Sequence, residues 1–178
     1  MNRSPDAVFS EEQTLRDNPF VYLAFAGGVA IIGVFGYAMY RQFVEGKPFG
    51  DRPMGDTALA IVGGLYLLLG VFMIFLCVRC RLETEVRGSG LYLRYFPFHW
   101  TFRKIPLENV RSCVARTYRP IWEYGGWGIR VGAGKKAYNV SGNRGVELEY
   151  ENGKKLLIGS KKAEQLASAI ESIRRQLE

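Results

Sequence analysis

Histidine and cysteine, from which most metal sites and many catalytic sites are built, are scarce in this sequence. His99 is the only histidine, and its neighbours offer neither the cysteines nor the carboxylates of a metal site or a catalytic triad. Of the three cysteines, Cys77 and Cys80 are close together and Cys113 is distant, which is not the pattern of a disulfide framework. We therefore expect no metal, no cofactor and no catalytic residue.

Charged side chains are missing from two long stretches. No Asp, Glu, Lys or Arg occurs in residues 19–40 or 57–78, and each stretch is 22 residues long. A helix of that length crosses a bilayer core of about 30 Å at ~1.5 Å per residue. A buried soluble helix is the alternative for either stretch alone. Two stretches only sixteen residues apart favour a transmembrane helical hairpin over residues 19–78.

The two predicted spans also lack the polar side chains that mark ion or substrate paths in a membrane. They contain no Asp, Glu, Lys, Arg or His, so we do not expect a transporter or a channel. Small residues instead recur at four-residue spacing: Ala24 with Gly28, Ala26 with Ala30, and Ala60 with Gly64. Such faces let helix backbones approach closely in lipid. We expect them to pack the two helices on each other; docking on a helix of another protein is the alternative.

Charge is divided unevenly along the chain. Residues 1–78 hold five Lys and Arg against seven Asp and Glu, a net charge of −2, whereas residues 79–178 hold nineteen against ten, a net charge of +9. Three Lys and Arg lie between the spans and six lie close to their outer ends. Because cytoplasmic loops carry the excess of Lys and Arg, we expect both termini and the C-terminal half on the cytoplasmic side. Cys77-x-x-Cys80 has redox spacing, but it closes a membrane helix, and we assign it no role.

From residue 79 onward the sequence is typical of a small β-rich domain. Short segments with period-two alternation, such as "LYLRYF", "VELEY" and "KLLIG", are separated by Gly, Pro, Asn and Ser. The chain then ends in a predicted helix, 161–177, with an apolar stripe formed by Leu166, Ile170, Ile173 and Leu177. We expect six or seven antiparallel strands in a barrel or sandwich that this helix caps. The polar segment 1–18 has no core of its own, so we expect a partner to hold it.

Two membrane helices, a β-rich domain of 79–178 and a terminal helix together resemble bacterial membrane proteins with a pleckstrin-homology-like (PH-like) domain. The run "YRPIWEYGGWGIR…AYNVSGNRGVELEYENGKKLLIGS" is similar to that of small uncharacterised members of this group. The resemblance implies a membrane-anchored α+β fold with a PH-like antiparallel β-barrel or sandwich. It implies little about function, because PH-like domains bind lipid headgroups, peptides or other proteins.

The glycine-rich stretch "WGIRVGAGKKAYN", residues 127–139, has the composition of a phosphate-binding loop but not its spacing. With Gly134-Lys135 as the second glycine and the lysine, the first glycine would fall on Ile129, and the Ser/Thr position is Lys136. A strand follows instead of a helix. We therefore interpret the glycines as turn and bulge positions, and expect Trp122, Tyr124 and Trp127 to supply bulk to the core or the sheet edge.

The excess of basic residues calls for an anionic surface or a partner. Residues beside the bilayer and in predicted turns are the candidate contacts with the membrane surface or a partner: Arg79, Arg81, Arg87, Lys135, Lys136 and Arg144. Each cation near an anionic leaflet contributes ~1 kcal/mol. Because the domain is tethered beside anionic lipid, we do not expect nucleic acid as the partner. The loop 141–145 is the segment most like an anion-binding nest, and a plain hairpin loop is the favoured alternative.

These observations leave three functional hypotheses. The first is a non-catalytic accessory or scaffolding subunit of a larger bacterial membrane complex, by analogy a photosynthetic or respiratory assembly. It would lie in the bacterial inner (cytoplasmic) membrane, with integral membrane subunits and anionic lipids as partners. The second is a membrane-tethered sensor that binds anionic lipid or peptide. The third, an enzyme, is the least favoured.

Overall fold

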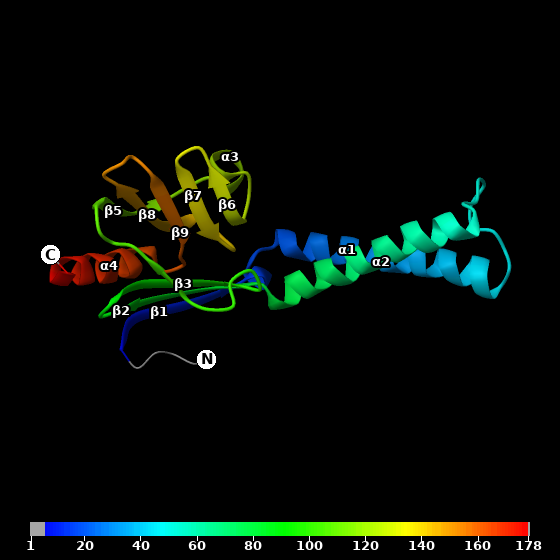
Figure 1. Cartoon of the computed structure of the whole chain (residues 1–178), viewed down its shortest axis with the longest axis horizontal. Coiled ribbons are helices and arrows are strands. Elements are labelled where there is room, and N and C mark those ends of the chain that lie inside the picture. The colour runs from blue at the N-terminus through cyan, green and yellow to red at the C-terminus, as the bar shows by residue number, and fades with distance from the viewer. Residues whose placement is uncertain (1–5, 178) are drawn as a thin grey trace. The chain divides into compact units, whose positions relative to one another are not determined.

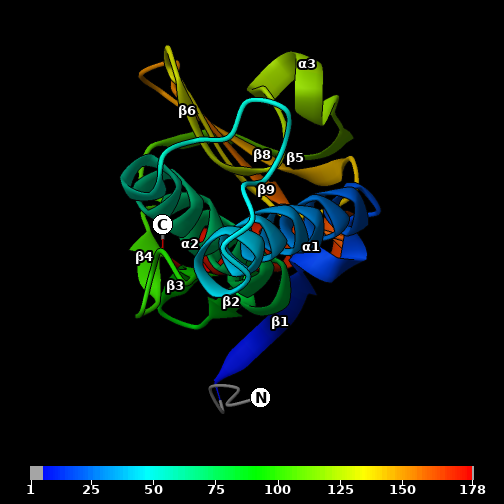
Figure 2. The same ribbon diagram turned by 90° about the vertical axis from the view of Figure 1, so that its right-hand side faces the viewer.

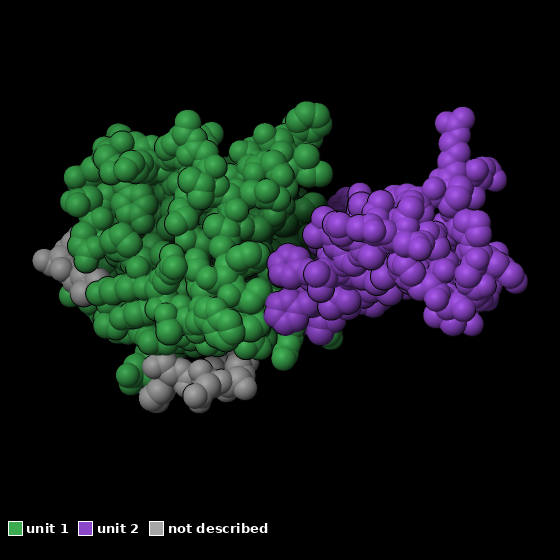
Figure 3. Space-filling model, turned by 45° about the vertical axis from the view of Figure 1, so that its right-hand side comes forward, with its two compact units in different colours: residues 1–18, 79–178 green, residues 19–78 purple. Residues whose placement is uncertain are grey.

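The chain folds into two units. The computed structural model describes residues 6–177. Unit 1 comprises residues 1–18 and 79–178, and unit 2 comprises residues 19–78 (Figure 3). Unit 2 is therefore an insertion in the chain of unit 1.

Unit 2 is a pair of apolar helices. Helix α1 runs over Phe20–Met39 and continues as a π-helical turn, Tyr40–Val44, and helix α2 runs over Asp56–Arg79. Both are long and apolar enough to cross a membrane, judged by length and composition. The first helical segment extends four residues beyond the expected stretch, and an ion pair between Arg41 and Glu45, 3.5 Å apart, supports this last turn.

The described part of unit 1 consists of two β-sheets, two α-helices and a short 3-10 helix, Leu15–Asp17. The first sheet has the order β1 (Ala7–Thr14), β2 (Arg81–Arg87), β3 (Gly90–Phe96), β4 (Arg103–Ile105). The second has the order β5 (Val110–Thr117), β8 (Arg144–Tyr150), β9 (Lys155–Gly159), β7 (Lys135–Asn139), β6 (Gly128–Gly132). A short helix, α3 (Pro120–Tyr124), follows β5, and α4 (Ala163–Leu177) is the last element. The two sheets face one another (Figures 1 and 2).

The architecture is α+β, as expected, but the strands do not close into a barrel. Among the described residues no strand of the first sheet forms a backbone ladder with a strand of the second. The expectation of antiparallel strands throughout was also wrong, because β7 and β9 run parallel. Strand β9 pairs with β8, antiparallel to it, along one edge, and its other edge pairs with β7.

The hydrophobic core lies between the sheets and against α4, which sits between them at one end (Figure 1). Both sheets and the helix contribute fully buried residues: Leu82, Leu93, Val146, Leu148, Ile158, Leu166 and Ile170. Burial of each such side chain contributes about 1.5–3 kcal/mol. The predicted stripe of α4 is thus confirmed for Leu166, Ile170 and Ile173; the side chain of Leu177 lies outside the described part.

Helix α4 begins at Ala163, two residues later than expected. Lys161 and Lys162 form a turn instead, in which the Lys162 N–H donates to the Ser160 hydroxyl at 3.0 Å. The Ser160 hydroxyl therefore accepts a backbone N–H just before the start of α4, not one from the first turn of the helix.

The N-terminal segment is part of unit 1 rather than a separate polar tail. Strand β1 pairs along β2, and its inward side chains bond to the C-terminal half. Glu11 accepts hydrogen bonds from the Ser160 hydroxyl (2.5 Å) and the Lys161 N–H (2.8 Å), and Gln13 donates to the Gly159 carbonyl (2.8 Å). We expected a partner to hold this segment; the domain itself supplies the bonding groups.

Candidate functional site

The strand register gives unit 1 two distinct ends. Strand β1 leads into unit 2 and β2 leads out of it, and their residues Thr14 and Arg81 are paired. We call this side, which also includes the pairing of Arg81 with Phe96 in β3, the exit end. The second sheet also reaches the exit end, where the side-chain amide of Asn18 donates a hydrogen bond to the Val140 carbonyl at 3.2 Å. The opposite side, with the turns at 88–89, 133–134 and 151–154, is the far end.

The six basic residues singled out in the sequence divide between these ends. Arg79, Arg81 and Arg144 lie at the exit end, and Arg87, Lys135 and Lys136 lie at the far end. Arg144, in the loop considered as an anion-binding nest, forms an ion pair with Glu164 of α4. Its guanidinium is thus already engaged by a carboxylate. The structure therefore does not assemble these residues into one anionic-ligand site.

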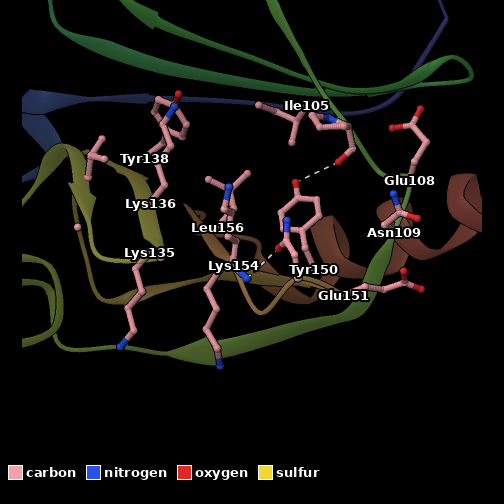
Figure 4. A pocket seen from close by; sticks show the side chains of 16 residues that line it. Ile105, Glu108, Asn109, Lys135, Lys136, Tyr138, Tyr150, Glu151, Lys154 and Leu156 are labelled. Atoms are coloured by element: carbon pink, nitrogen blue, oxygen red, sulfur yellow. Dashed lines mark hydrogen bonds between the residues drawn. The ribbon is translucent and has the colours of Figure 1, made fainter.

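The far end contains a groove with a volume of about 760 Å³. It opens between β4 of the first sheet and the hairpins β6–β7 and β8–β9 of the second. Half of the residues that line it are apolar or aromatic, among them Ile105, Tyr138, Tyr150 and Leu156, and the other half are polar or charged, with four lysines and two glutamates (Figure 4). The groove exists because α4 closes the space between the sheets on one side only. A cavity of this size with apolar and charged lining residues is suited to binding a ligand or peptide side chains.

Two polar side chains of the far-end groove, those of Tyr150 and Lys136, have contacts within the domain. Tyr150 donates a hydrogen bond to the Pro106 carbonyl at 3.0 Å, and burial, with a smaller contribution from Glu108, raises the pKa of its hydroxyl. The Lys136 ammonium lies over the Tyr138 ring, 4.8 Å from its centre.

Lys135 and Lys154 come from different hairpins at the edge of this groove. Their side chains extend in the same direction, away from Tyr150 and Ile105 (Figure 4). Within residues 6–177 neither lysine has an ion pair. The edge of the groove therefore carries two lysines without an ion pair, although Glu108 and Glu151 also line the groove, and these lysines favour a partner with acidic groups.

The outer face of the second sheet bears an ion-pair network that includes Glu147 and Glu149. Arg116 reaches Glu147 at 2.6 Å and Glu123 at 2.8 Å, and Lys155 reaches Glu149 at 3.2 Å. The hydrogen bond from Arg116 lowers the pKa of Glu123. Burial alone would raise the pKa of Glu147, but Arg116 and Lys155 lower it overall. These groups stabilise the sheet and leave no unpaired acid–base couple.

The glycine-rich stretch is a β-hairpin, as interpreted from the sequence. Its glycines lie in or beside β6 and β7, and Gly134 has a φ of +70° in the connecting turn. Trp127 is half-buried and donates its indole N–H to the Gly142 carbonyl at 2.9 Å. The expectation of a core or edge role was wrong for Trp122, which is 86% exposed on α3.

His99 lies in the connection between β3 and β4 and is buried. Its ring meets the Tyr138 ring edge to face, with 5.8 Å between the centroids. Burial, followed by the charges of Arg103 and Lys136, lowers its pKa, so the imidazole stays neutral at pH 7. Within the described residues, no three or more His, Cys, Asp or Glu side chains are grouped to hold a metal ion.

The small residues of the helices serve two different surfaces. Gly28 packs on α2: a Cβ atom there would lie 3.4 Å from the Gly70 carbonyl oxygen. Ala24 is half-buried, whereas Ala26, Ala30 and Ala60 are exposed and Gly64 has open space beside it. The packing role predicted for all six therefore holds for only part of them. Sequence reasoning missed Gly63 and Gly70, although their seven-residue spacing places them on one helix face.

The whole sequence corresponds to one protein family. The family described as "Family of unknown function (DUF6141)" matches residues 1–176. None of the curated proteins matches the chain. The match covers both units, so the helices and the β-sheet domain belong to a single family architecture.

Proposed function

Because the chain belongs to DUF6141, a family of unknown function, its role must be inferred from its own residues, and we propose that it is a non-catalytic accessory subunit of a larger membrane assembly. Helices α1 and α2 anchor it in the bilayer, and unit 1, a PH-like module, binds a neighbouring subunit. A photosynthetic or respiratory complex in the bacterial inner membrane is the kind of assembly that we expect.

The pairing of β1 with β2 supports a two-span topology. These strands lie on either side of unit 2 in the chain, and antiparallel pairing requires them to be on the same side of any membrane. An even number of crossings follows, which two helices satisfy and one would not. The excess of Lys and Arg outside the loop between the helices then assigns unit 1 to the cytoplasmic side.

The observation that carries the accessory role is the outward small-residue face of α1. Ala26, Ala30 and Gly33 follow one another at helical spacing, all are exposed, and a Cβ atom on Gly33 would meet nothing within 4 Å. The hairpin already packs through Gly28 and Gly70, so it does not need this second face. A face of small residues in lipid permits close contact with a helix of another subunit.

A second candidate is a sensor that binds an acidic peptide in the far-end groove. The apolar lining residues favour it, as do Lys135 and Lys154, which have no ion pair within the described residues.

The experiment is purification in mild detergent from its native membrane, followed by identification of co-purified subunits. Ala30→Phe should deplete the partner, because it fills the outward face of α1. Leu65→Phe is the matched control, since this exposed position is on α2 and already carries a branched side chain. Equal recovery of a partner with both variants, or recovery of a free monomer from wild type, would contradict the proposal. A monomer that binds acidic peptides through Lys135 and Lys154 would favour the sensor.

A further inference from the structure

Large hydrophobic side chains are exposed unevenly over unit 1. Seven are exposed among the described residues, and the three aromatic ones are Phe98 (55%), Trp100 (77%) and Trp122 (86%). Ile121, which is 56% exposed, lies beside Trp122 on α3. Exposed aromatic clusters of this kind on a small domain mark an interaction surface.

The loop between β3 and β4 places Phe98 and Trp100 at the exit end. Trp100 packs edge-on against Phe96, with ring centroids 5.5 Å apart, and the Arg81 guanidinium lies over the same Phe96 ring at 5.5 Å. Arg81 is only two residues beyond the end of α2. From strand pairing and chain length, the Cα atom of Phe98 is within about 12 Å of that of Arg81.

Helix α3 is held at the same end by a separate set of contacts. The Tyr118 N–H, just before α3, donates to the Asn143 carbonyl at 2.8 Å, and the Trp127 indole just after it donates to Gly142. The neighbouring Val140 carbonyl accepts from Asn18, the residue before unit 2. Two segments distant in sequence thus carry their exposed aromatic residues to the end where the chain leaves for the helices.

The exit end carries exposed arginines that a lipid surface would accept, together with the exposed Asp17. Arg16, Arg79 and Arg119 are exposed there, and guanidinium groups pair with lipid phosphates. Tryptophan favours the headgroup level of a bilayer, where its ring is in an apolar layer and its N–H remains hydrated. The far end has lysines and, among the described residues, two exposed large hydrophobic residues, Val8 at the start of β1 and Val131 in the β6–β7 hairpin, neither of which is aromatic.

We propose that the exit end of unit 1 contacts the membrane–water interface, with Phe98, Trp100 and Trp122 inserted at headgroup level. This inference rests on the proposed membrane anchoring and adds a second, peripheral attachment to it. The occupant is the bilayer that α1 and α2 enter, because strand pairing keeps Phe98 and Trp100 near Arg81, which is two residues beyond the end of α2 in the chain. Unit 1 is then attached to the membrane by this surface as well as through its two chain connections to the helices.

The test uses tryptophan quenching in the full chain, reconstituted in phosphatidylcholine vesicles whose acyl chains are brominated near the headgroup. Trp122→Phe with Trp127→Phe leaves Trp100 as the only tryptophan, and Trp100→Phe with Trp127→Phe leaves Trp122. A far-end control carries Val131→Trp in a background with all three native tryptophans changed to phenylalanine. We expect the brominated lipid to quench Trp100 and Trp122 several-fold more than the probe at position 131.

A fourth protein, with Leu68→Trp in the tryptophan-free background and measured in lipid brominated near the ends of its acyl chains, separates this inference from the membrane anchoring, because position 68 lies at the middle of α2. Strong quenching at position 68 without quenching of Trp100 and Trp122 would overturn the interfacial contact and leave the anchoring intact. No quenching at position 68 would contradict the anchoring itself. Quenching at position 131 equal to that of Trp100 would also overturn the inference, because insertion would then not be confined to the exit end.

Discussion

Replacing Glu11 by alanine should destabilise unit 1 far more than replacing its neighbour Glu12. Glu11 is 8% exposed and accepts hydrogen bonds from the Ser160 hydroxyl and the Lys161 N–H. Hydrogen bonds to a charged group contribute about 1.5–3 kcal/mol each, so the loss of both should cost roughly 3–5 kcal/mol. Glu12 points to the other face of β1 and has only a partly exposed ion pair with Arg81 at 3.8 Å. Its removal should cost less than about 1 kcal/mol.

The tryptophans make this difference measurable in the intact chain. All three, Trp100, Trp122 and Trp127, lie in unit 1, so their fluorescence reports on that unit and not on the helices. In detergent solution, thermal unfolding of Glu11→Ala should occur on the order of 10 °C below that of Glu12→Ala. Glu11→Gln, which keeps one acceptor oxygen, should lie between them.

Equal unfolding temperatures for the two alanine variants would refute the reasoning. They would mean that the N-terminal strand contributes little to unit 1 and that its bonds to the segment before α4 are replaced by water at no cost. A partner would then again be needed to hold residues 1–18. A large loss with both variants would instead mean that β1 is sensitive to any change, and the specific role of the buried carboxylate would be wrong.

Three further predictions concern packing and charge. Gly145→Ala should destabilise unit 1 by about 1–3 kcal/mol, since its Cβ would lie 2.5 Å from the Ile158 carbonyl oxygen, whereas Gly132→Ala, with a nearest contact of 4.0 Å, should be nearly neutral in urea unfolding. Gly70→Ala should separate α1 from α2, because its Cβ would lie 3.0 Å from the Gly28 carbonyl oxygen, and spin labels on the two helices would report a longer distance. The pKa of Glu123 in the folded chain is lower than its usual value of 4.5, so its carboxylate stabilises the fold above that pH, and this contribution is lost as the pH falls. Arg116→Met removes the partner that lowers this pKa, so the urea midpoint should depend less on pH between 7 and 3. An unchanged dependence would contradict this.

Elements with a strong local pattern could be predicted from the sequence. The two uncharged stretches became α1 and α2, the apolar stripe became the buried face of α4, and segments such as "LYLRYF" and "VELEY" became strands. The strands β1 and β5 were missed. The inward face of β1 carries Glu11 and Gln13, which only their hydrogen-bond partners 146 to 150 residues away make compatible with burial. Strand β5 has no regular alternation of buried and exposed residues.

The sequence identified residues of the candidate surfaces more often than it predicted their positions in the fold. The basic residues were known from the sequence, but their separation into two ends depends on strand register. The exposed position of Trp122 and the burial of His99 likewise depend on which turn faces which sheet. Neither is a property of the surrounding few residues.

The sequence by itself determined that this chain has two helices able to enter lipid and a basic β-rich domain, because charge, hydropathy and periodicity are properties of neighbouring residues. Only the tertiary structure decided that β1 and β2 join across the helical insertion, that Gly28 packs against Gly70, and that the exposed aromatic side chains lie where the chain leaves for the helices. Those features are contacts between residues far apart in the chain. They are fixed by the fit of whole surfaces to one another, which no local pattern contains.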